Sequence, residues 1–431
     1  MKVCFIMYQG NMYSGGQGVY LYYLTRELTR MGHEVHVLAG PPYPTLAEGV
    51  IGHNLVTHSY WSFHHEKEDF LFNRNPLTHF HPVNFYEFVS TRIALSSLLL
   101  TFSVRAWVKL GELSREQHRF DIVHDNQTLS YGTWLMEASG FPVVATIHHP
   151  LTIDLQNALQ QAGSLYEKAR RILWSPWVMQ AVVARRMKRT IVVSETSRKA
   201  VQEAFNLDPG RMHVVHNGID TETFRPLPDI ERQEGLILYV GNSEDRNKGA
   251  RYLLDALHLL QNDKRDFHLA FVDHKKENLK LAPRLVQKYG LSSRVHFTGR
   301  VSTEQLVKLY NQAMIVVSPS LYEGFGLPAA EAMSCGAPVI ATTGGAFPEV
   351  IDHERTGWLV EPGSGRALAD AIGKLSDDEG LRERLGTAGR ESILARFNWR
   401  KAAEETLVVY EELLAERRSE VGRNRRHQAI S

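Results

Sequence analysis

The chain has 431 residues, of which 43% are hydrophobic and 23% charged; this length favours two domains, and the composition is typical of soluble globular proteins. Its 49 Lys and Arg nearly balance its 48 Asp and Glu, so no nucleic-acid partner is expected, because nucleic-acid-binding proteins carry a basic excess. Cys4 and Cys335 are the only cysteines, which argues against a disulfide framework or a cysteine metal cluster and fits a cytoplasmic location.

Apolar segments typical of buried strands alternate with helical segments along the whole chain. The predicted strands are residues 3–7, 35–39, 122–124, 143–147 and 191–193 in the first half, and residues 236–240, 268–272, 295–298, 315–317 and 339–341 in the second. Between the first two strands, Leu21, Leu24 and Leu28 line one face of a helix. This alternation predicts an α/β fold with parallel sheets that helices cover on both faces.

Neither the N-terminus nor any internal segment resembles a targeting or membrane-spanning sequence. The apolar run at residues 1–7 is too short for a signal peptide. Residues 93–102 are apolar but shorter than the roughly 20 residues that span a bilayer, so a core helix is expected there.

The alternation breaks between residues 207 and 228, where the run from Asn217 to Asp220 is typical of a turn in a hinge. We therefore predict two doubly wound domains, an N-terminal one at residues 1–210 and a C-terminal one at residues 216–398. Residues 416–431 are rich in arginine and are predicted to be a disordered tail.

A glycine-rich loop follows the first predicted strand. Gly15, Gly16 and Gly18 precede or open the first predicted helix, where bare backbone N–H groups can hold a phosphate. The spacing is not that of a dinucleotide-binding G-x-G-x-x-G loop, and the chain has no Walker A sequence, so neither NAD binding nor ATP hydrolysis is favoured.

Two segments have an unusual composition. Residues 60–90 contain His64, His65, His79 and His81, whose spacing fits no metal-ligand motif, so a loop is favoured over a metal site. The segment 166–189 combines basic residues with tryptophans: Lys168, Arg170, Arg171, Arg185, Arg186, Lys188, Arg189, Trp174 and Trp177. It is either a peripheral contact with an anionic membrane or a surface helix whose tryptophans pack inward.

The most informative segment is residues 318–341. Glu323 and Glu331 flank a Gly-Phe-Gly loop that lies between a predicted strand and a short helix. Gly324 and Gly326 allow the backbone to approach a ligand, and the helix N-terminus attracts phosphate. Two carboxylates beside such a loop suit the hydroxyl groups of a sugar or a ribose.

This segment resembles the signature of the retaining glycosyltransferases of family 4, which have the GT-B fold. Further similarity lies in the run from Gly344 to Glu349 and near residues 146–149, 194–195, 216–220 and 241–249. The resemblance implies two Rossmann-like domains facing across a cleft, the first binding the acceptor and the second a nucleotide sugar. It also implies that a last helix, at residues 399–415, packs back on the first domain.

The resemblance implies a role for individual residues as well. Lys248 and Arg246 would neutralise the departing phosphate, although the family's usual arginine is replaced by Asn242. His148 would contact the donor sugar near the reacting centre, and Glu323 would orient the sugar and the diphosphate. The implied donor-binding residues are Gly15, Gly16, Gly324, Phe325, Gly326, Leu327, Glu331, Arg300 and Val301, the last two near the base.

No Asp-x-Asp sequence suited to holding a metal against a diphosphate occurs, so the expected enzyme is metal-independent and uses a nucleoside diphosphate sugar as its co-substrate. The family's front-face scheme is favoured, with a covalent intermediate on Glu323 as the alternative. Two other functions stay open: a nucleotide-sugar epimerase on the same fold, or a non-catalytic sugar-nucleotide-binding protein. The base, sugar and acceptor do not follow from the sequence.

Overall fold

The structure is a computed structural model that describes residues 1–10, 16–56, 81–92, 98–116, 119–150, 152, 155, 159, 164–273 and 279–428. Only the backbone is described at residues 88, 91, 92, 170, 173, 174 and 421–428. Gly15 and the three histidines His64, His65 and His79 lie outside the described residues.

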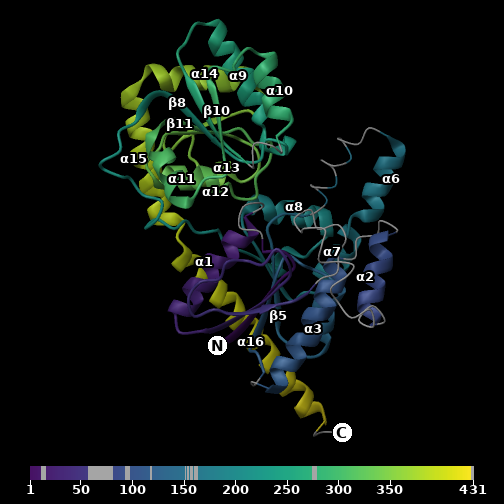
Figure 1. Ribbon diagram of the computed structural model, residues 1–431. Helices are drawn as coiled ribbons and strands as arrows, with labels where there is room; N and C mark the ends of the chain where they lie inside the picture. Colours follow the sequence, from purple (N-terminus) through teal and green to yellow (C-terminus); the bar gives the residue numbers. More distant parts are fainter. Residues whose placement is uncertain are drawn as a thin grey trace. The chain divides into compact units, whose positions relative to one another are not determined.

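The chain divides into two compact units (Figure 1). Unit 1 comprises residues 1–193, 197–215 and 402–431, and unit 2 comprises residues 194–196 and 216–401. Each unit contains one parallel sheet, so the α/β class predicted from the alternation of strands and helices is confirmed.

Unit 1 is built on a seven-stranded sheet in the order β3-β2-β1-β4-β5-β6-β7. Its strands are β1 (Lys2–Met7), β2 (Glu34–Ala39), β3 (Ile51–Asn54), β4 (Ile122–Asn126), β5 (Val143–Ile147), β6 (Arg189–Val192) and β7 (Met212–Val214). All pairs are parallel. The central strands β4 and β5 are buried along their whole length, as expected for a sheet covered on both faces.

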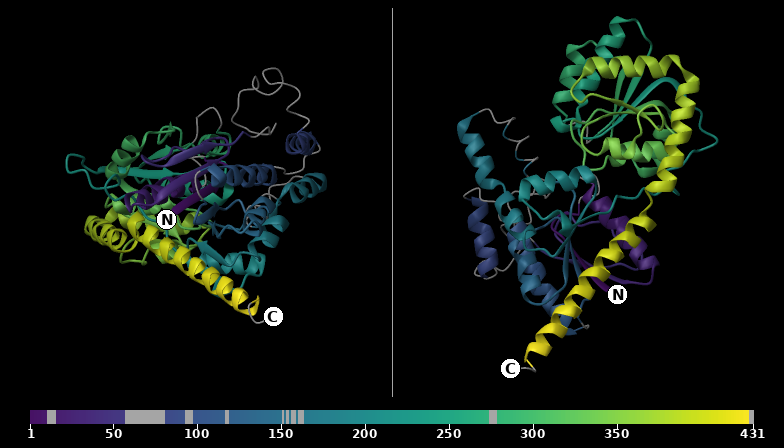
Figure 2. Two further views of the ribbon diagram at one scale, coloured as in Figure 1. Left: turned by 90° about the horizontal axis from the view of Figure 1, so that it is seen from below. Right: turned by 180° about the vertical axis from the view of Figure 1, so that it is seen from behind.

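Helices cover both faces of this sheet. They are α1 (Gln17–Arg30), α2 (Pro82–Arg92), α3 (Leu98–Glu116), α4 (Tyr131–Ala138), α6 (Leu165–Trp174), α7 (Trp177–Ala184), α8 (Glu195–Phe205) and the long α16 (Trp399–Gln428). Cys4 and Ile6 of β1 pack into a core with α3, α4, α7 and α8. On the other face His124 of β4 contacts Tyr410 of α16, which lies along unit 1 in Figure 2.

Unit 2 is built on a six-stranded sheet in the order β10-β9-β8-β11-β12-β13. Its strands are β8 (Gln233–Val240), β9 (His268–Val272), β10 (Val295–Gly299), β11 (Ala313–Ser318), β12 (Val339–Thr342) and β13 (Trp358–Val360). Its helices are α9 (Ala250–Asn262), α10 (Leu281–Lys288), α11 (Thr303–Gln312), α12 (Leu327–Ser334), α13 (Phe347–Val350), α14 (Gly365–Asp377) and α15 (Glu379–Arg396). One core contains α9, α10 and α14, and a second contains α11, α12 and α13, so this sheet too is covered on both faces.

Three strands, β3, β7 and β13, were not predicted from the sequence. β3 and β7 are the two edge strands of the seven-stranded sheet, and β13 is an edge strand of the six-stranded sheet. Residues of β3 are largely exposed, and β7 and β13 have three residues each. The exposed residues of β3 and the short length of β7 and β13 leave no long apolar run by which these strands could be predicted.

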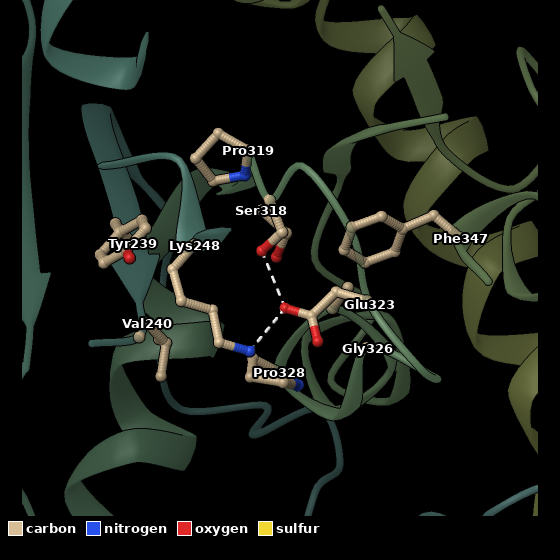
Figure 3. A pocket seen from close by; sticks show the side chains of 12 residues that line it. Tyr239, Val240, Lys248, Ser318, Pro319, Glu323, Gly326, Pro328 and Phe347 are labelled. Carbon is tan, nitrogen blue, oxygen red and sulfur yellow. Dashed lines mark hydrogen bonds and ion pairs between the residues drawn. The ribbon is translucent and has the colours of Figure 1, made fainter. Parts of the chain in front are cut away.

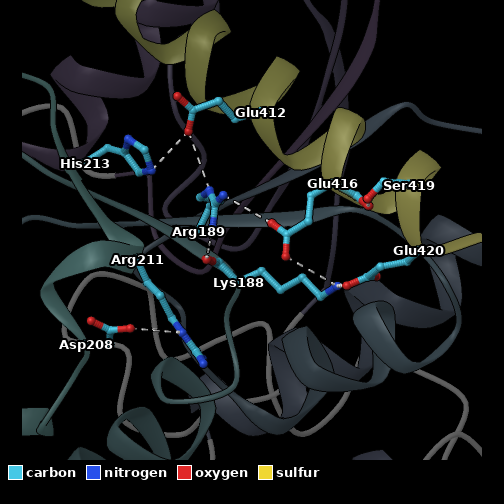
Figure 4. Close-up of polar contacts among 9 residues, drawn as sticks. All are labelled: Lys188, Arg189, Asp208, Arg211, His213, Glu412, Glu416, Ser419 and Glu420. Atoms are coloured by element: carbon cyan, nitrogen blue, oxygen red, sulfur yellow. Dashed lines mark hydrogen bonds and ion pairs between the residues drawn. The ribbon is translucent and has the colours of Figure 1, made fainter. Parts of the chain in front are cut away.

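Helix α16 differs from the sequence expectation at its C-terminal end. The helix continues to Gln428, whereas we expected a disordered tail from residue 416. Glu412, Glu416 and Glu420 lie on one helix face at a spacing of four residues and meet basic residues of the sheet (Figure 4). Lys188 Nζ is 2.6 Å from Glu420, and Arg189 is 3.2 Å from Glu416. This glutamate row is the sequence signal for the longer helix.

The basic segment at residues 166–189 is partly neutralised within unit 1. Lys188 and Arg189 pair with α16, Arg171 pairs with Glu167 at 2.6 Å, and the guanidinium of Arg186 lies 4.8 Å from the centre of the Trp134 ring. Leu165 and Tyr166 are nevertheless strongly exposed, so a peripheral membrane contact stays a prediction. Among the described residues, no helix combines the length and apolar character needed to cross a membrane.

Candidate active site

Each sheet reverses the direction of its chain connections at one pair of adjacent strands. The pair is β1 and β4 in unit 1, and β8 and β11 in unit 2. The loops that leave such a pair run to opposite sides, and ligands of open α/β sheets bind outside the carboxyl ends of these strands. The predicted site residues of each unit should therefore lie near these strand ends.

A lysine–glutamate pair lies at the strand ends of unit 2. Lys248 ends the short 3₁₀ helix after β8, and Glu323 lies in the loop after β11. Lys248 Nζ is 2.8 Å from Glu323 Oε1, which also accepts a hydrogen bond from Ser320 Oγ at 2.8 Å. These residues line a pocket together with Tyr239 (Figure 3). The Lys248 side chain is 31% exposed, so an anionic ligand can approach its ammonium group.

Helix α12 begins in the same pocket. Gly326 caps the helix in the left-handed conformation with φ 92°, and a Cβ there would come within 2.6 Å of the Phe347 ring. Pro328 stands in the first turn, where its missing N–H costs nothing. Gly324 and Leu327 complete the loop that the sequence identified. The unpaired N–H groups and positive dipole end of α12 suit a phosphate.

Glu331 lies in the interior of α12 and does not line that pocket. Its Oε2 accepts a hydrogen bond from Tyr310 Oη at 3.1 Å. Burial raises the pKa of Glu331 to about 8, more than the Tyr310 hydrogen bond lowers it. The carboxyl group is therefore largely protonated at neutral pH, whereas the sequence indicated a carboxylate that accepts ribose hydroxyls.

The remaining donor-binding residues predicted in unit 2 do not line the pocket of the Lys248–Glu323 pair. Phe325 is 3% exposed, and its ring packs in the core against Phe397. Arg300 and Val301 follow the edge strand β10, which β9 and β8 separate from β11. Arg300 is exposed, whereas Val301 packs against the core.

Arg246 and Asn242 precede Lys248 in the same loop. The Arg246 side chain is exposed and does not line the pocket. Asn242, which replaces the family's usual arginine, accepts a hydrogen bond from the backbone N–H of Glu244 at 3.1 Å through its Oδ1. Asn242 therefore shapes the loop, and Lys248 is the cation that reaches Glu323.

Glu349 is the last residue of the run from Gly344 to Glu349 that resembles the family. Its carboxylate accepts several hydrogen bonds within unit 2. It accepts hydrogen bonds from the backbone N–H groups of Glu195 and Thr196 at 2.8 and 2.7 Å. Burial alone would raise the pKa of Glu349, but hydrogen bonds from His216, Thr196 and these N–H groups lower it to about 2. Glu349 is thus ionised at any physiological pH.

In unit 1, Gly16 and His148 occupy the expected strand ends. Gly16 caps α1 in the left-handed conformation with φ 72°. His148 follows β5, and its Nε2 lies 2.8 Å from Oδ1 of Asn126, the last residue of β4. Gln127 Oε1 accepts the backbone N–H of His148 at 2.6 Å. Burial lowers the pKa of His148 to about 3, so its imidazole is neutral at physiological pH.

Four residues of these sites are not predicted by the sequence motifs: Ser320, Tyr239, Asn126 and Gln127. Ser320 and Tyr239 line the pocket with Lys248, and the other two hold His148. Asn126 ends β4 and Gln127 follows it, and polar residues at a strand's carboxyl end were a usable signal. Tyr239 gives no such signal, because an aromatic residue within a strand is usually a core residue.

Comparison with known proteins identifies the family. Residues 14–223 match the model of "Glycosyltransferase Family 4", and residues 220–392 match that of "Glycosyl transferases group 1". A relative from Mycolicibacterium hassiacum, the MMP alpha-(1->4)-mannosyltransferase, is 34% identical over 96% of this chain and 99% of its own length. The chain is a family 4 glycosyltransferase.

Solved structures show the GT-B fold for this glycosyltransferase. The sucrose-phosphate synthase of Thermosynechococcus elongatus has a TM-score of 0.73 and 23% identity, with 96% of this chain and 100% of that chain covered. HepE from Anabaena, in complex with UDP-glucose, has a TM-score of 0.67 and 19% identity, with the same coverage of both chains. The predicted family, fold and enzyme class are thus confirmed.

Replacement of Gly345 by alanine should impair this glycosyltransferase by displacing Glu323. Gly345 has φ 71°, and a Cβ there would lie 2.2 Å from the Glu323 carbonyl oxygen. Since a displacement of about 1 Å can cost roughly a hundredfold in rate, we expect kcat to fall about tenfold to a hundredfold. The measurement is steady-state glycosyl transfer, combined with circular dichroism to verify folding.

Gly32→Ala is the matched control for backbone strain. Gly32 also has a positive φ of 84°, but a Cβ there meets nothing within 4 Å. This variant should therefore lose about 1 kcal/mol of unfolding free energy from the left-handed backbone and keep its activity. Equal kcat values for the two variants would show that the Gly345 loop does not position Glu323.

Proposed function

We propose that this protein is a retaining glycosyltransferase that moves a hexosyl group from a nucleoside diphosphate sugar to an acceptor hydroxyl without a metal ion. The observation that carries the proposal is the Lys248–Glu323 pair beside the N-terminus of α12, at the strand ends of unit 2. A fixed cation, helix N–H groups and a carboxylate suit a ligand that has both phosphate and sugar groups.

The diphosphate is bound by the N-terminus of α12 and by Lys248. When the bond between sugar and phosphate breaks, negative charge develops on the leaving phosphate, and a fixed ammonium stabilises that charge more than it stabilises the ground state. Glu323 holds Lys248 in place and accepts hydrogen bonds from the sugar hydroxyls. Arg246 is the second, more exposed cation of the same loop.

The other proposed contacts follow the resemblance residue by residue. Glu331 accepts the ribose hydroxyls, and backbone groups near Arg300 and Val301 hold the base. Gly16 lets the backbone approach the diphosphate at the N-terminus of α1. His148 contacts the donor sugar as a neutral hydrogen-bonding group, since its pKa is about 3.

In the proposed mechanism the acceptor hydroxyl attacks the anomeric carbon from the face that the nucleotide leaves. The bond between the anomeric carbon and the phosphate oxygen breaks, and the electron pair leaves with the nucleoside diphosphate. The acceptor oxygen forms the new bond, and a phosphate oxygen of the leaving group takes its proton. Configuration at the anomeric carbon is therefore retained.

Mannose is the first candidate for the transferred sugar. The relative from Mycolicibacterium hassiacum, named an alpha-(1->4)-mannosyltransferase, matches this chain over nearly its whole length. The HepE structure with UDP-glucose shows that the same fold binds a nucleotide sugar in that protein. We therefore propose an α-mannosyl donor first and an α-glucosyl donor second.

A donor panel tests this function. The protein is incubated with GDP-mannose, GDP-glucose, UDP-glucose and ADP-glucose, with and without oligosaccharide acceptors, and nucleoside diphosphate release is measured in the presence of EDTA. We expect acceptor-dependent release with one donor and an α-linked product by NMR. Isomerised donor without acceptor would indicate the epimerase, and saturable binding without turnover would indicate the non-catalytic binder.

Replacement of Tyr239 by phenylalanine tests whether the pocket beside Lys248 holds the donor. The Tyr239 side chain is almost fully buried, its hydroxyl has no hydrogen-bond partner among the described residues, and it lines that pocket. Burial, reinforced by Asp273 and Glu323, raises the pKa of Tyr239 well above the usual value. The hydroxyl therefore keeps its proton and can donate a hydrogen bond. It can therefore hydrogen-bond to a ligand oxygen.

We expect Tyr239→Phe to weaken donor binding about tenfold while the unfolding free energy stays equal or rises, because an unpaired buried hydroxyl costs about 1–3 kcal/mol. Isothermal titration calorimetry and chemical denaturation give the two values. Tyr310→Phe is the control, since Tyr310 donates to Glu331 in the folded protein and its loss should reduce stability. Lower stability of Tyr239→Phe with unchanged donor affinity would show that the hydroxyl is structural.

A further inference from the structure

Asn126 links the N-terminus of α1 to the histidine after β5. Its Nδ2 donates a hydrogen bond to the backbone carbonyl oxygen of Gln17 at 3.2 Å, and its Oδ1 lies 2.8 Å from His148 Nε2. Asn126 and His148 are both buried. The three residues come from α1, β4 and the loop after β5, which meet at the strand ends of unit 1.

The chemistry of these partners fixes the orientation of the Asn126 amide. A backbone carbonyl oxygen can only accept a hydrogen bond, so the amide atom that faces Gln17 must be the NH₂ group. The carbonyl oxygen of the same amide then faces His148 Nε2, and this oxygen can only accept. His148 must consequently carry its proton on Nε2, which leaves Nδ1 as the unprotonated acceptor.

Gln127 holds the backbone of the same histidine by the same logic. Its Oε1 accepts the N–H of His148 at 2.6 Å, and its Nε2 donates to the carbonyl oxygen of His149 at 3.0 Å. The Tyr20 ring packs nearly perpendicular to the imidazole, with 4.8 Å between ring centres. Ring and backbone are thus both held, so the direction of Nδ1 is fixed before any ligand binds.

We propose that Asn126 is a positioning residue that holds His148 in the Nε2–H tautomer, so that Nδ1 accepts a hydrogen bond from a hydroxyl of the donor sugar. This inference rests on the proposed function for the identity of the ligand, but the tautomer is a property of the protein alone. No described residue donates a hydrogen bond to His148 Nδ1. A sugar hydroxyl can both donate to Nδ1 and accept from another group, which suits this position.

Among the described residues, the titratable groups that face His148 are His124 on β4, His149 in its own loop and Tyr20 on α1. Burial lowers the pKa of His124 to about 3 and raises that of Tyr20 above its usual value. The hydrogen bond from Asn126 therefore selects one neutral tautomer rather than a protonation state.

The direct test is ¹⁵N NMR of the histidine rings in the ligand-free, full-length protein. The His148 signals are assigned by their loss in His148→Gln, and the chemical shifts of the two ring nitrogens report which one carries the proton. We expect a protonated Nε2 and an unprotonated Nδ1 from about pH 6 to 8. A protonated Nδ1 in the wild-type protein would overturn the proposal, whether or not the protein is active.

Three variants separate positioning from structure. Asn126→Leu should give a mixture of tautomers, whereas Asn126→Asp keeps an acceptor and should retain the Nε2–H tautomer. Gln180→Leu is the control, because Gln180 is a buried amide that contacts the backbone of Gln127 and Thr128 in the same loop but not His148. It should leave the tautomer unchanged.

Kinetics with the donor that the panel identifies supply the second measurement. For Asn126→Leu we expect kcat/KM for that donor to fall about tenfold, with unchanged inhibition by the free nucleoside diphosphate, which has no sugar. In Asn126→Asp the added negative charge should raise the pKa of His148. The acid limb of the plot of kcat/KM against pH should therefore move to higher pH. An Asn126→Leu variant with the wild-type tautomer and wild-type kcat/KM would refute the role of Asn126.

Discussion

Replacement of Lys248 by alanine should reduce kcat by about a hundredfold to a thousandfold, which is the usual effect of removing one group that stabilises developing negative charge. The Lys248 ammonium is 2.8 Å from Glu323 and borders the N-terminus of α12. Without it, the leaving phosphate loses its nearest fixed cation, and the Glu323 carboxylate lacks its counter-charge. Donor affinity should fall much less than kcat, because the charge that Lys248 stabilises grows as the bond breaks.

Arg246→Ala is the matched control for Lys248→Ala. Both variants remove one positive charge from the same short 3₁₀ helix, but the Arg246 side chain is exposed and does not line the pocket. Single-turnover kinetics and donor titrations on the two variants separate binding from chemistry. We expect kcat of Arg246→Ala to fall by no more than about tenfold. A larger loss of kcat in Arg246→Ala than in Lys248→Ala would assign the leaving-group role to Arg246 instead.

The sequence predicted the fold wherever apolar runs mark buried strands. The central strands of both sheets are buried on both faces, as at β5 and β11, so their composition alone reveals them. The edge strand β3, whose residues are largely exposed, has no such requirement and was not predicted. The extension of α16 escaped for a different reason, since Glu420 and Glu416 of the extension pair with Lys188 and Arg189, more than 200 residues earlier in the chain.

The site was predictable as far as local motifs describe it. Glycines with positive φ, such as Gly16 and Gly326, appear in the sequence because few other residues tolerate that backbone. The pairing of Lys248 with Glu323 joins two loops 75 residues apart, and no local pattern encodes it. The same holds for the contact of Asn126 with His148, which requires that β4 and β5 lie side by side in parallel register.

Donor binding should become tighter as pH rises towards about 8, and Glu331 is the group responsible. Burial raises the pKa of Glu331 to about 8 in the free protein. If its carboxylate accepts the ribose hydroxyls, binding favours the ionised form and releases a proton below that pH. The association constant for the nucleotide sugar should then rise by up to about tenfold per pH unit and level off above pH 8.

Calorimetric titration in two buffers with different ionisation enthalpies counts the released proton. Glu331→Gln should remove the pH dependence, whereas Glu304→Gln, which alters an exposed residue on α11, should keep it. A pH-independent affinity of the wild-type protein between about pH 6 and 8 would exclude Glu331 from the binding site.

The same pKa has an opposite consequence for stability. Since the pKa of Glu331 is higher in the folded protein (about 8) than its ordinary value of 4.5, folding favours the protonated carboxyl group. This contribution is fully present below pH 4.5 and is lost as pH rises through about 8. Wild-type Tm should therefore fall relative to Glu331→Gln over the pH range in which donor affinity rises. With rising pH, stability should thus fall while donor affinity rises. Burial destabilises the ionised Glu331 carboxylate in the free protein, whereas the hydroxyls of the bound ribose stabilise it.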